Sequence, residues 1–307
     1  MAGEALKTPA DDLESMRSID GCNQTAAAED APSSALALTV IEPTPGWRSI
    51  DLTELWRYRE LLYFLIWRDV KIRYKQTVLG AAWAVIQPLM GMLIFTIFFG
   101  KLGRLDEQVA APYPVFVYAG LLPWLFFANA VTTGGQSLVS QAHLISKIYF
   151  PRLFVPLASV GAFLVDFAVS FAVLLCLMVG YGVAFGWGLL AVPLLTVATI
   201  IAAVGVGTLL AALTVAYRDF RYVVPFMVQI WMFVSPVVFP FEIVPQKWRL
   251  IYSLNPMAGI ISGFRSAILG EPFRLEAIAI SVSVGVVLLV AGSYYFRRVE
   301  RRFADII

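Results

Sequence analysis

The stretch RDVKIRYKQTVLG, residues 68–80, places four cations and a single acid directly before a run that carries no charge until Lys101. The whole chain of 307 residues is 59% hydrophobic and only 14% charged, whereas soluble proteins have about 25% charged residues. Its mean hydropathy is +0.77. This composition indicates a membrane protein, and the basic stretch marks the point at which the chain enters its first apolar run.

Residues 1–45 differ from the rest because they are rich in Ala, Ser and Pro, with eight acids against Lys7 and Arg17. Such a composition is typical of disorder, and we expect an acidic cytoplasmic tail without a fold of its own. The apolar stretch ALALTVI follows acids and is barely long enough for a signal peptide, so we expect none. Residues 46–307 then form the membrane domain.

Residues 52–75 show the periodicity of an amphipathic helix, with one apolar and one charged stripe. The apolar stripe contains Leu55, Tyr58, Leu62, Ile66, Val70 and Tyr74. The charged stripe contains Arg57, Glu60, Arg68, Lys71 and Lys75. Trp56 and Trp67 lie beside the apolar stripe, which favours a helix in the membrane interface. The alternative is a surface helix of a soluble domain, but no other segment has the composition of such a domain.

Six uncharged runs follow this helix, each close to the ~20 residues that cross a bilayer core of ~30 Å. They lie at about 78–100, 115–135, 153–180, 188–216, 222–241 and 277–296. Because lipid offers the backbone no hydrogen-bond partner, we expect an all-α integral membrane protein with six transmembrane helices. From Arg57 onward, this topology places fourteen Lys and Arg residues on one side and six on the other. The positive-inside rule then predicts that both termini are cytoplasmic.

Two of the connections between these runs have helical patterns of their own. Between the second and third runs, residues 137–149 can form a short helix that ends before Pro151 and needs a partner for its apolar face. Between the fifth and sixth runs, residues 246–270 predict a re-entrant or interfacial hairpin on the outer face, with Asn255 and Pro256 as the cap and first residue of its second helix. A plain surface loop is the alternative, and it would leave many apolar side chains in water.

Motifs for enzymatic chemistry are missing from the sequence. It contains no GxxxxGK[ST] phosphate loop, no HExxH zinc site, no GxSxG elbow and no paired catalytic carboxylates. Its two cysteines, Cys22 and Cys176, predict neither a disulfide framework nor a metal pair, and its one histidine, His143, cannot form a cluster. We therefore expect no catalytic residues and no metal site.

Asp166 is the one acid inside a predicted span, which makes it a functional hypothesis by default. A structural role, paired with a Ser, Thr or Arg of the bundle, is an equally good interpretation. A secondary transporter that uses Asp166 as its proton or sodium site is the main alternative function. A membrane glycosyltransferase or acyltransferase is disfavoured because the spans lack clustered acids and a catalytic histidine.

Six ordered motifs carry a family resemblance. They are ELWRYRELLYFLIWRDVKIRYKQTVLGAAWAVIQP, YAGLLPWLFF, SKIYFPR, AYRDFR, SPVVFP and LNPM. From about Gly46 to the C-terminus, the chain resembles the permease subunits of bacterial type-2 ABC exporters of polysaccharides, the O-antigen, capsule and teichoic acid class. The long acidic tail departs from that family, and its role stays open.

The resemblance implies a multi-pass homodimer in the bacterial inner membrane that binds two copies of a separate ATPase subunit and moves a lipid-linked glycan. ATP and Mg²⁺ would bind that partner ATPase, so this chain would carry no cofactor and bind no nucleic acid. The helix at 52–75 would be a cytoplasmic gate helix. The residues that match the family's gate helix are Arg57, Arg59, Arg68, Lys71, Arg73 and Lys75. The helix at 137–149 would dock on the ATPase through Leu144, Ser146, Lys147 and Tyr149, and the hairpin at 246–270 would close the pore from outside.

This function is physically coherent with the residue types present. Cationic side chains at a membrane surface attract the phosphates of a lipid-linked glycan, and sugar rings slide over aromatic faces without a fixed hydrogen-bond pattern. The aromatic residues of the first two spans that could form such a channel lining are Trp83, Phe95, Phe98, Phe99, Trp124, Phe126 and Phe127. Contact with lipid, or an interfacial aromatic belt, is an equally good interpretation of each of these side chains.

Overall fold

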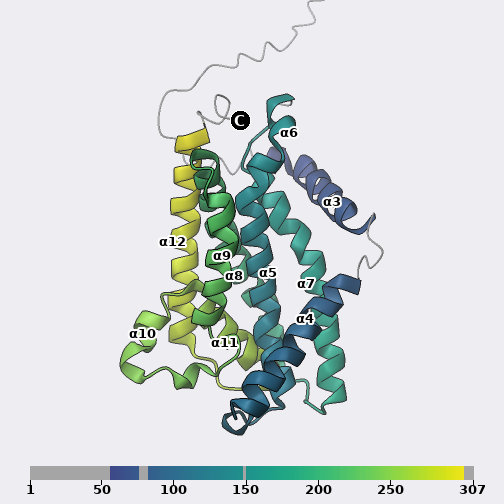
Figure 1. The fold of residues 1–307 in the computed structure, drawn as a ribbon, viewed down its shortest axis with the longest axis vertical. Coiled ribbons are helices and arrows are strands. Elements are labelled where there is room, and N and C mark those ends of the chain that lie inside the picture. The colour runs from purple at the N-terminus through teal and green to yellow at the C-terminus, as the bar shows by residue number, and fades with distance from the viewer. Residues whose placement is uncertain (1–55, 76–81, 148–149, 301–307) are drawn as a thin grey trace, which may run out of the picture. The chain divides into compact units, whose positions relative to one another are not determined.

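The computed structural model describes residues 56–75, 82–147 and 150–300, and these residues are helical, without a strand. Five helices are long and apolar enough to cross a membrane. They are α4 (Ala82–Phe95) with its π-helical continuation η1 (Thr96–Leu102), α5 (Tyr113–Ser140), α7 (Phe154–Gly180), α8 (Val192–Ala216) with the preceding turn η3 (Trp187–Ala191), and α12 (Leu275–Glu300). The expected all-α membrane class is thus confirmed for the described part of the chain, which Figure 1 shows as an upright bundle.

The predicted fifth span, 222–241, is not confirmed as a crossing. Its helix α9 (Phe220–Val234) has 15 residues, which rise about 22 Å, less than the ~30 Å of a bilayer core. Between the end of α8 and α10, the chain nevertheless passes from one end of the bundle to the other. Figure 1 shows that α8 ends at the end where α6 (Ala142–Lys147) lies, whereas α10 (Arg249–Tyr252) and α11 (Pro256–Leu269) lie at the opposite end.

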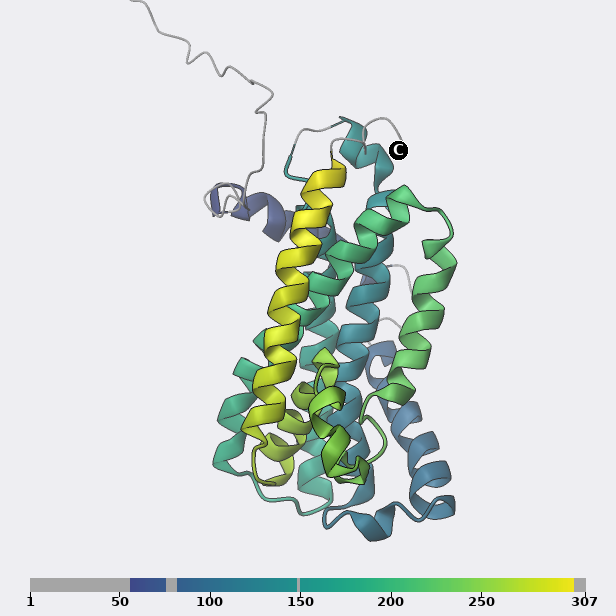
Figure 2. The ribbon, with the colours of Figure 1, turned by 90° about the vertical axis from the view of Figure 1, so that its left-hand side faces the viewer.

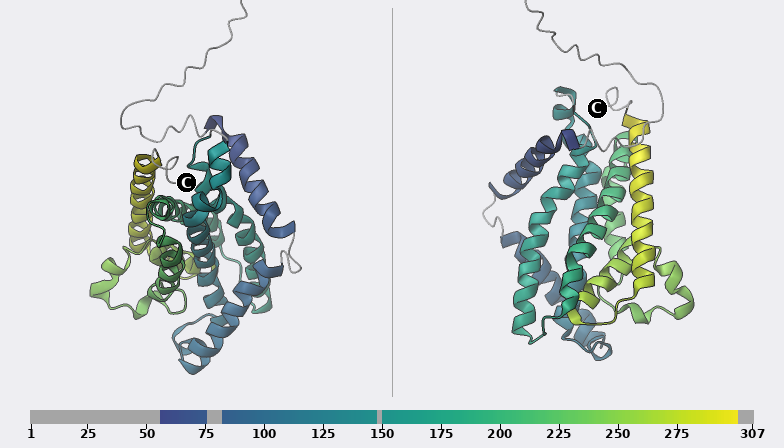
Figure 3. Two further views of the ribbon diagram at one scale, coloured as in Figure 1. Left: turned by 45° about the horizontal axis from the view of Figure 1, so that its top comes forward. Right: turned by 180° about the vertical axis from the view of Figure 1, so that it is seen from behind.

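Helix α5 forms the centre of the bundle. Its aromatic residues Phe116, Tyr118, Trp124 and Phe127 are almost completely buried, and they contact side chains of α7, α8, α9 and α11. Figure 3 shows α12 and α3 (Arg59–Lys75) on opposite flanks of this core. In Figure 2, α9 stands at the edge of the bundle, and it buries only Val224 and Val228. The bundle therefore has a tightly packed centre and two loosely covered helices, α3 and α9.

Glycines bring α8 and α12 into backbone contact. A Cβ atom on Gly205 would lie 2.5 Å from the backbone nitrogen of Leu289, and one on Gly292 would lie 2.5 Å from the carbonyl oxygen of Gly205. Small residues at such crossings are typical of helix pairs in membranes, because dispersion contacts replace the hydrophobic effect there. Gly205 therefore marks a close contact between the two helices, whereas Gly207 has ordinary distances to its neighbours.

The predicted hairpin at 246–270 has one buried and one exposed helix. Almost every side chain of α11 is buried, including Ile260, Ile261 and Phe264, whereas Leu250 and Ile251 of α10 are exposed. The side chain of Asn255 accepts a hydrogen bond from the Met257 N–H, so the expected cap of α11 is confirmed. The indole N–H of Trp231 in α9 also donates to Asn255. This residue therefore joins α9 to α11; re-entry into a membrane is not confirmed.

Two predicted helix boundaries need correction. The helix expected at 137–149 begins inside α5, which continues to Ser140, and only α6 is a separate short helix. The hydroxyl groups of Ser137 and Ser140 donate to carbonyls of the preceding turn, so the chain stays helical within α5 through these residues. The acidic tail, residues 52–55 of the predicted gate helix, and Tyr149 lie outside the described residues.

Replacing Gly205 by Ala tests the close contact of α8 and α12. The new Cβ would meet the backbone of Leu289, which cannot rotate away, so we expect a loss of about 1–3 kcal/mol in stability, as for other overpacked sites. Gly207→Ala is the matched control, because its Cβ would have no neighbour closer than 3.9 Å. Thermal unfolding of the two purified variants measures the difference, and an equal melting temperature would contradict the contact.

Candidate functional site

Helix α3 packs its apolar stripe against α7. Leu65 is buried, and Ile66 lies so close to Gly161 of α7 that a Cβ atom there would be 2.6 Å from its Cδ1. The opposite side of α3 exposes the large aromatic residues Tyr63 (70%) and Trp67 (55%), and Trp56, just before the helix, is 71% exposed. The predicted two-sided character of this helix is therefore present in the structure, with aromatic as well as basic side chains on its outer face.

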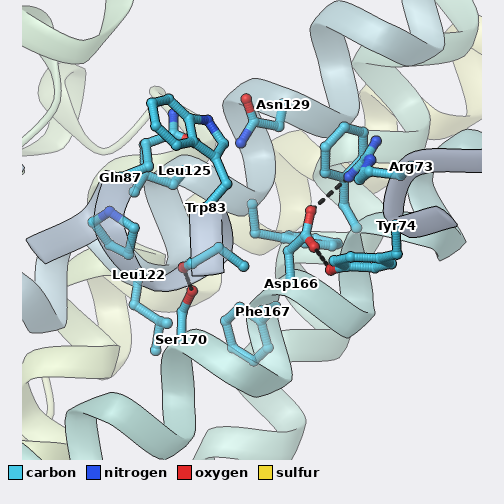
Figure 4. A pocket seen from close by; sticks show the side chains of 14 residues that line it. Arg73, Tyr74, Trp83, Gln87, Leu122, Leu125, Asn129, Asp166, Phe167 and Ser170 are labelled. Carbon is cyan, nitrogen blue, oxygen red and sulfur yellow. Dashed lines mark hydrogen bonds and ion pairs between the residues drawn. The ribbon is translucent and has the colours of Figure 1, made fainter. Parts of the chain in front are cut away.

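A polar cluster joins the end of α3 to the middle of α7. The guanidinium of Arg73 donates from Nη1 to Oδ2 of Asp166 at 2.5 Å and lies 3.7 Å from the ring centre of Phe163. The hydroxyl of Tyr74 donates to the other carboxylate oxygen of Asp166 (Figure 4). Burial, followed by the bond to Asp166, raises the pKa of Tyr74 to about 12, so this hydroxyl keeps its proton at physiological pH.

This cluster gives Asp166, the acid in the middle of α7, two hydrogen-bond partners. Asp166 has a cation and a phenol as partners, as the structural interpretation expects, although both come from α3 rather than from another span. A charge buried in a membrane protein needs such partners because removing it from water is costly. The arrangement gives no specific support to the alternative in which Asp166 binds protons or sodium ions.

A pocket of about 490 Å³ adjoins the cluster between α3, α4, α5 and α7. Its walls are mainly apolar and aromatic, and its polar members are Arg73, Tyr74, Gln87, Asn129, Asp166 and Ser170. Figure 4 shows Gln87 and Trp83 on one side of this space, with Asp166 on the other. The pocket has the size of a small-molecule site, and no sequence motif predicted it, because its lining residues are spread over four helices from Arg73 to Ser170.

The six cations predicted for a gate fall into two groups. Arg57, Arg59, Lys71 and Lys75 are exposed. Arg68 is instead half-buried, and its guanidinium bonds Asp69 and, at 2.7 Å, the side-chain oxygen of Gln141 at the end of α5. Since Arg73 bonds Asp166, two of the six cations hold α3 in place, three are exposed on the helix, and Arg57 is exposed just before it.

The aromatic residues proposed as a channel lining also divide by exposure. Trp124, Phe126 and Phe127 are buried inside the single chain, where Phe127 meets Trp231 and Phe126 meets Phe167 edge to face. Phe95 is half-buried, whereas the side chains exposed on α4 and η1 are Trp83, Phe98 and Phe99. The buried rings stabilise the core, and only the exposed ones have a surface that faces out of this chain.

The residues proposed for ATPase docking lie around α6. Leu144 is half-buried and packs against the apolar cluster formed by Leu138 and Phe154, whereas Lys147 is exposed. The side chain of Ser146 and the whole of Tyr149 lie outside the described part of the structure. The exposed surface of α6 that the structure describes is therefore polar, whereas Leu144 packs against the bundle.

Arg265 of α11 is 98% buried, and no role was predicted for it from the sequence. Its guanidinium donates to the carbonyl oxygens of Phe116, Val237 and Phe239 and lies 3.6 Å from the ring centre of Phe116. These carbonyls belong to the first turn of α5 and to the segment that follows α9. Arg265 therefore fixes α11 at the end of the bundle opposite α6. The sequence feature that indicates such a role is an arginine within an apolar helical pattern.

Replacing Asp166 by Asn tests the polar cluster. The variant leaves Arg73 without its carboxylate, and we expect a loss of about 1.5–3 kcal/mol, the usual value of a hydrogen bond to a charged group. The matched control is Asp219→Asn, because Asp219 is exposed and its side chain does not cap α9. Chemical unfolding in detergent measures both variants, and equal stabilities would show that the cluster does not hold α3.

Comparison with known proteins agrees with this architecture. Residues 60–269 match the family described as ABC-2 type transporter. An O-antigen export system permease protein RfbA of Myxococcus xanthus is 30% identical over 260 residues, which cover 83% of this chain and 98% of that protein. An RfbA protein of Klebsiella pneumoniae is 29% identical over 253 residues, 81% of this chain and 95% of the relative. The polysialic acid transport protein KpsM of Escherichia coli is 23% identical over 67% of this chain and 80% of its own length.

The relatives are permease proteins, and together with the five apolar helices they make this chain a multi-pass protein of the inner membrane. The family match extends from α3 through α11, so it includes the polar cluster, the pocket and the Arg265 contacts. Both the residues matched and the helical architecture lead to the same assignment. This chain belongs to the ABC-2 type transporter family.

Proposed function

We propose that this chain is the channel-forming membrane subunit of an ATP-driven exporter that moves lipid-linked polysaccharide across a bacterial inner membrane. The observation that carries the proposal is the similarity to two O-antigen export permeases over more than four-fifths of the chain. ATP hydrolysis would take place on a separate ATPase, which agrees with a sequence that has no phosphate loop. ATP and Mg²⁺ would bind there, and this chain would only transmit the motion.

The surface of α3 supports a role as the entry gate. Arg59, Lys71 and Lys75 of α3 are exposed, as are the rings of Tyr63 and Trp67 on the same helix, and Arg57 is exposed just before it. A membrane surface that combines cations with aromatic rings attracts phosphate and contacts sugar rings, and both groups occur in a lipid-linked glycan. Because Asp166 and Gln141 bond the two remaining cations, this surface has a fixed position on the bundle.

The surface of α9 supports a homodimer. This helix buries Val224 and Val228 and exposes the large side chains Tyr222, Phe226, Ile230 and Phe233. The exposed face also contains the amide of Gln229, which lipid cannot satisfy. A second copy of the chain would cover this face, and a pore between the two copies would open and close as the partner ATPases close and separate.

The placement of charges supports a cytoplasmic position for α6 and for both termini. The starts of α7 and α9 and the end of α12 lie at the α6 end and carry Arg152, Arg221, Arg297 and Arg298. The docking of an ATPase at α6 would then take place on the side where ATP is available. The exposed Lys147 is the described side chain that we expect to contact it.

An exchange of neighbouring residues tests the gate. In a strain that lacks the chromosomal copy, the variant Lys71→Ile with Ile72→Lys moves one cation to another exposed position without a change in net charge. We expect a marked loss of surface polysaccharide and a build-up of lipid-linked precursor inside the cell, measured by immunoblot and by precursor extraction. The wild-type chain should restore export only when its partner ATPase is also produced.

The matched control is Lys101→Leu with Leu102→Lys, which makes the same exchange between two exposed residues at the opposite end of the bundle. Export should continue in this control. Normal surface polysaccharide in the α3 exchange would contradict the gate, and export without any ATPase would contradict the proposed function itself.

A further inference from the structure

The pocket between α3, α4, α5 and α7 contains two amide groups without partners. Neither the side chain of Gln87 in α4 nor that of Asn129 in α5 forms a hydrogen bond with a described residue, although both line the pocket. Both helices are apolar spans. Polar side chains inside a membrane are costly and are kept where they face a partner or a cavity. Their amide groups offer donors to a ligand that brings acceptors.

The charges of the pocket argue against an anionic ligand. Among the described lining residues, Arg73 is the one cation and Asp166 the one acid, and they bond each other at 2.5 Å. The pocket is therefore neutral as a whole. A phosphate placed at the amides would meet no uncompensated cation and would be desolvated at high cost. A neutral acceptor, such as an ester carbonyl, fits the two amides without that penalty.

The remaining walls fit a hydrocarbon chain. Leu122, Leu125 and Phe126 of α5 line the pocket together with Phe163 and Phe167 of α7, and the rings of Phe126 and Phe167 contact each other edge to face. Trp83, at the start of α4, is 56% exposed while it also lines the pocket, so the rim is accessible from outside the chain. Because α4, α5 and α7 are apolar spans, the molecules that meet this rim are those of the surrounding bilayer.

We propose that this pocket binds one diacyl phospholipid of the surrounding membrane. Its ester carbonyls accept hydrogen bonds from the amides of Gln87 and Asn129, and one of its acyl chains lies against the apolar side chains of α5 and α7 that line the pocket. The bound lipid fills the space beside the Arg73–Asp166 pair and so supports the position of α3. The site does not depend on the proposed export function, because it requires only membrane lipid.

Photolabelling tests the site directly. The full chain is placed in nanodiscs that contain phosphatidylethanolamine with a diazirine on one acyl chain, and the labelled peptides are mapped by mass spectrometry. We expect labelling of α5 and α7 around Leu125 and Phe167. Asn129→Leu and Gln87→Leu should each lower this labelling about two- to tenfold, since each removes a hydrogen bond. Both substitutions place an apolar residue in an apolar span and so should insert normally.

Two further variants make the result decisive. Gln229→Leu removes an exposed amide on α9, outside the pocket, and should leave the labelling unchanged. Leu125→Trp fills the pocket without a change to either amide and should abolish the labelling of α7. Equal labelling in the wild type and in all three pocket variants would overturn the proposal. Displacement of the label by an equal amount of polyprenyl phosphate would also overturn it, because the pocket would then bind the anionic carrier.

Discussion

The ion pair between Arg73 and Asp166 fixes α3, a basic helix beside the apolar bundle. Placing a lone carboxylate or guanidinium in hydrocarbon costs free energy, and the ion pair between the two groups lowers that cost. The Tyr74 hydroxyl donates to the second carboxylate oxygen. The contact joins the end of α3 to the middle of α7. The position of the basic helix, the shape of the adjoining pocket and the surface offered by α3 all depend on it.

Arg265 is a second buried charge that needs hydrogen-bond partners, and it lies at the other end of the bundle. Three backbone carbonyls, rather than an acid, surround its guanidinium, and they fix α11 against α5. Between these two polar anchors, α5, α7, α8 and α12 pack through buried aromatic residues and through the glycine contact at Gly205. The less covered elements are α3, α6 and α9, and those are the elements to which the proposed functions of gate, ATPase contact and dimer contact are assigned.

Sequence patterns predicted the membrane class, five of the six apolar helices, the two-sided α3 and the Asn255 cap, because hydropathy and capping depend on neighbouring residues. They did not show that α9 is only 15 residues long, since the turn that follows Val234 is also rich in apolar residues. They also could not pair Arg73 with Asp166 or place Arg265 on its three carbonyls, because those contacts join residues that are distant along the chain. The buried state of Trp124 and Phe127 follows from the same tertiary packing.

The most direct test of the central claim, that the Arg73–Asp166 pair holds α3 against α7, is the rate of disulfide formation between Ile66→Cys and Gly161→Cys. In this pair, a Cβ on residue 161 lies 2.8 Å from Cγ1 of Ile66, so the two new Cβ atoms fall within reach of a disulfide. Cys22 and Cys176 are replaced by Ser, and the oxidation is followed in native membranes. With Asp166 present, we predict rapid and nearly complete cross-linking, and with Asp166→Asn a several-fold slower reaction. Equal rates in the two backgrounds would contradict the claim.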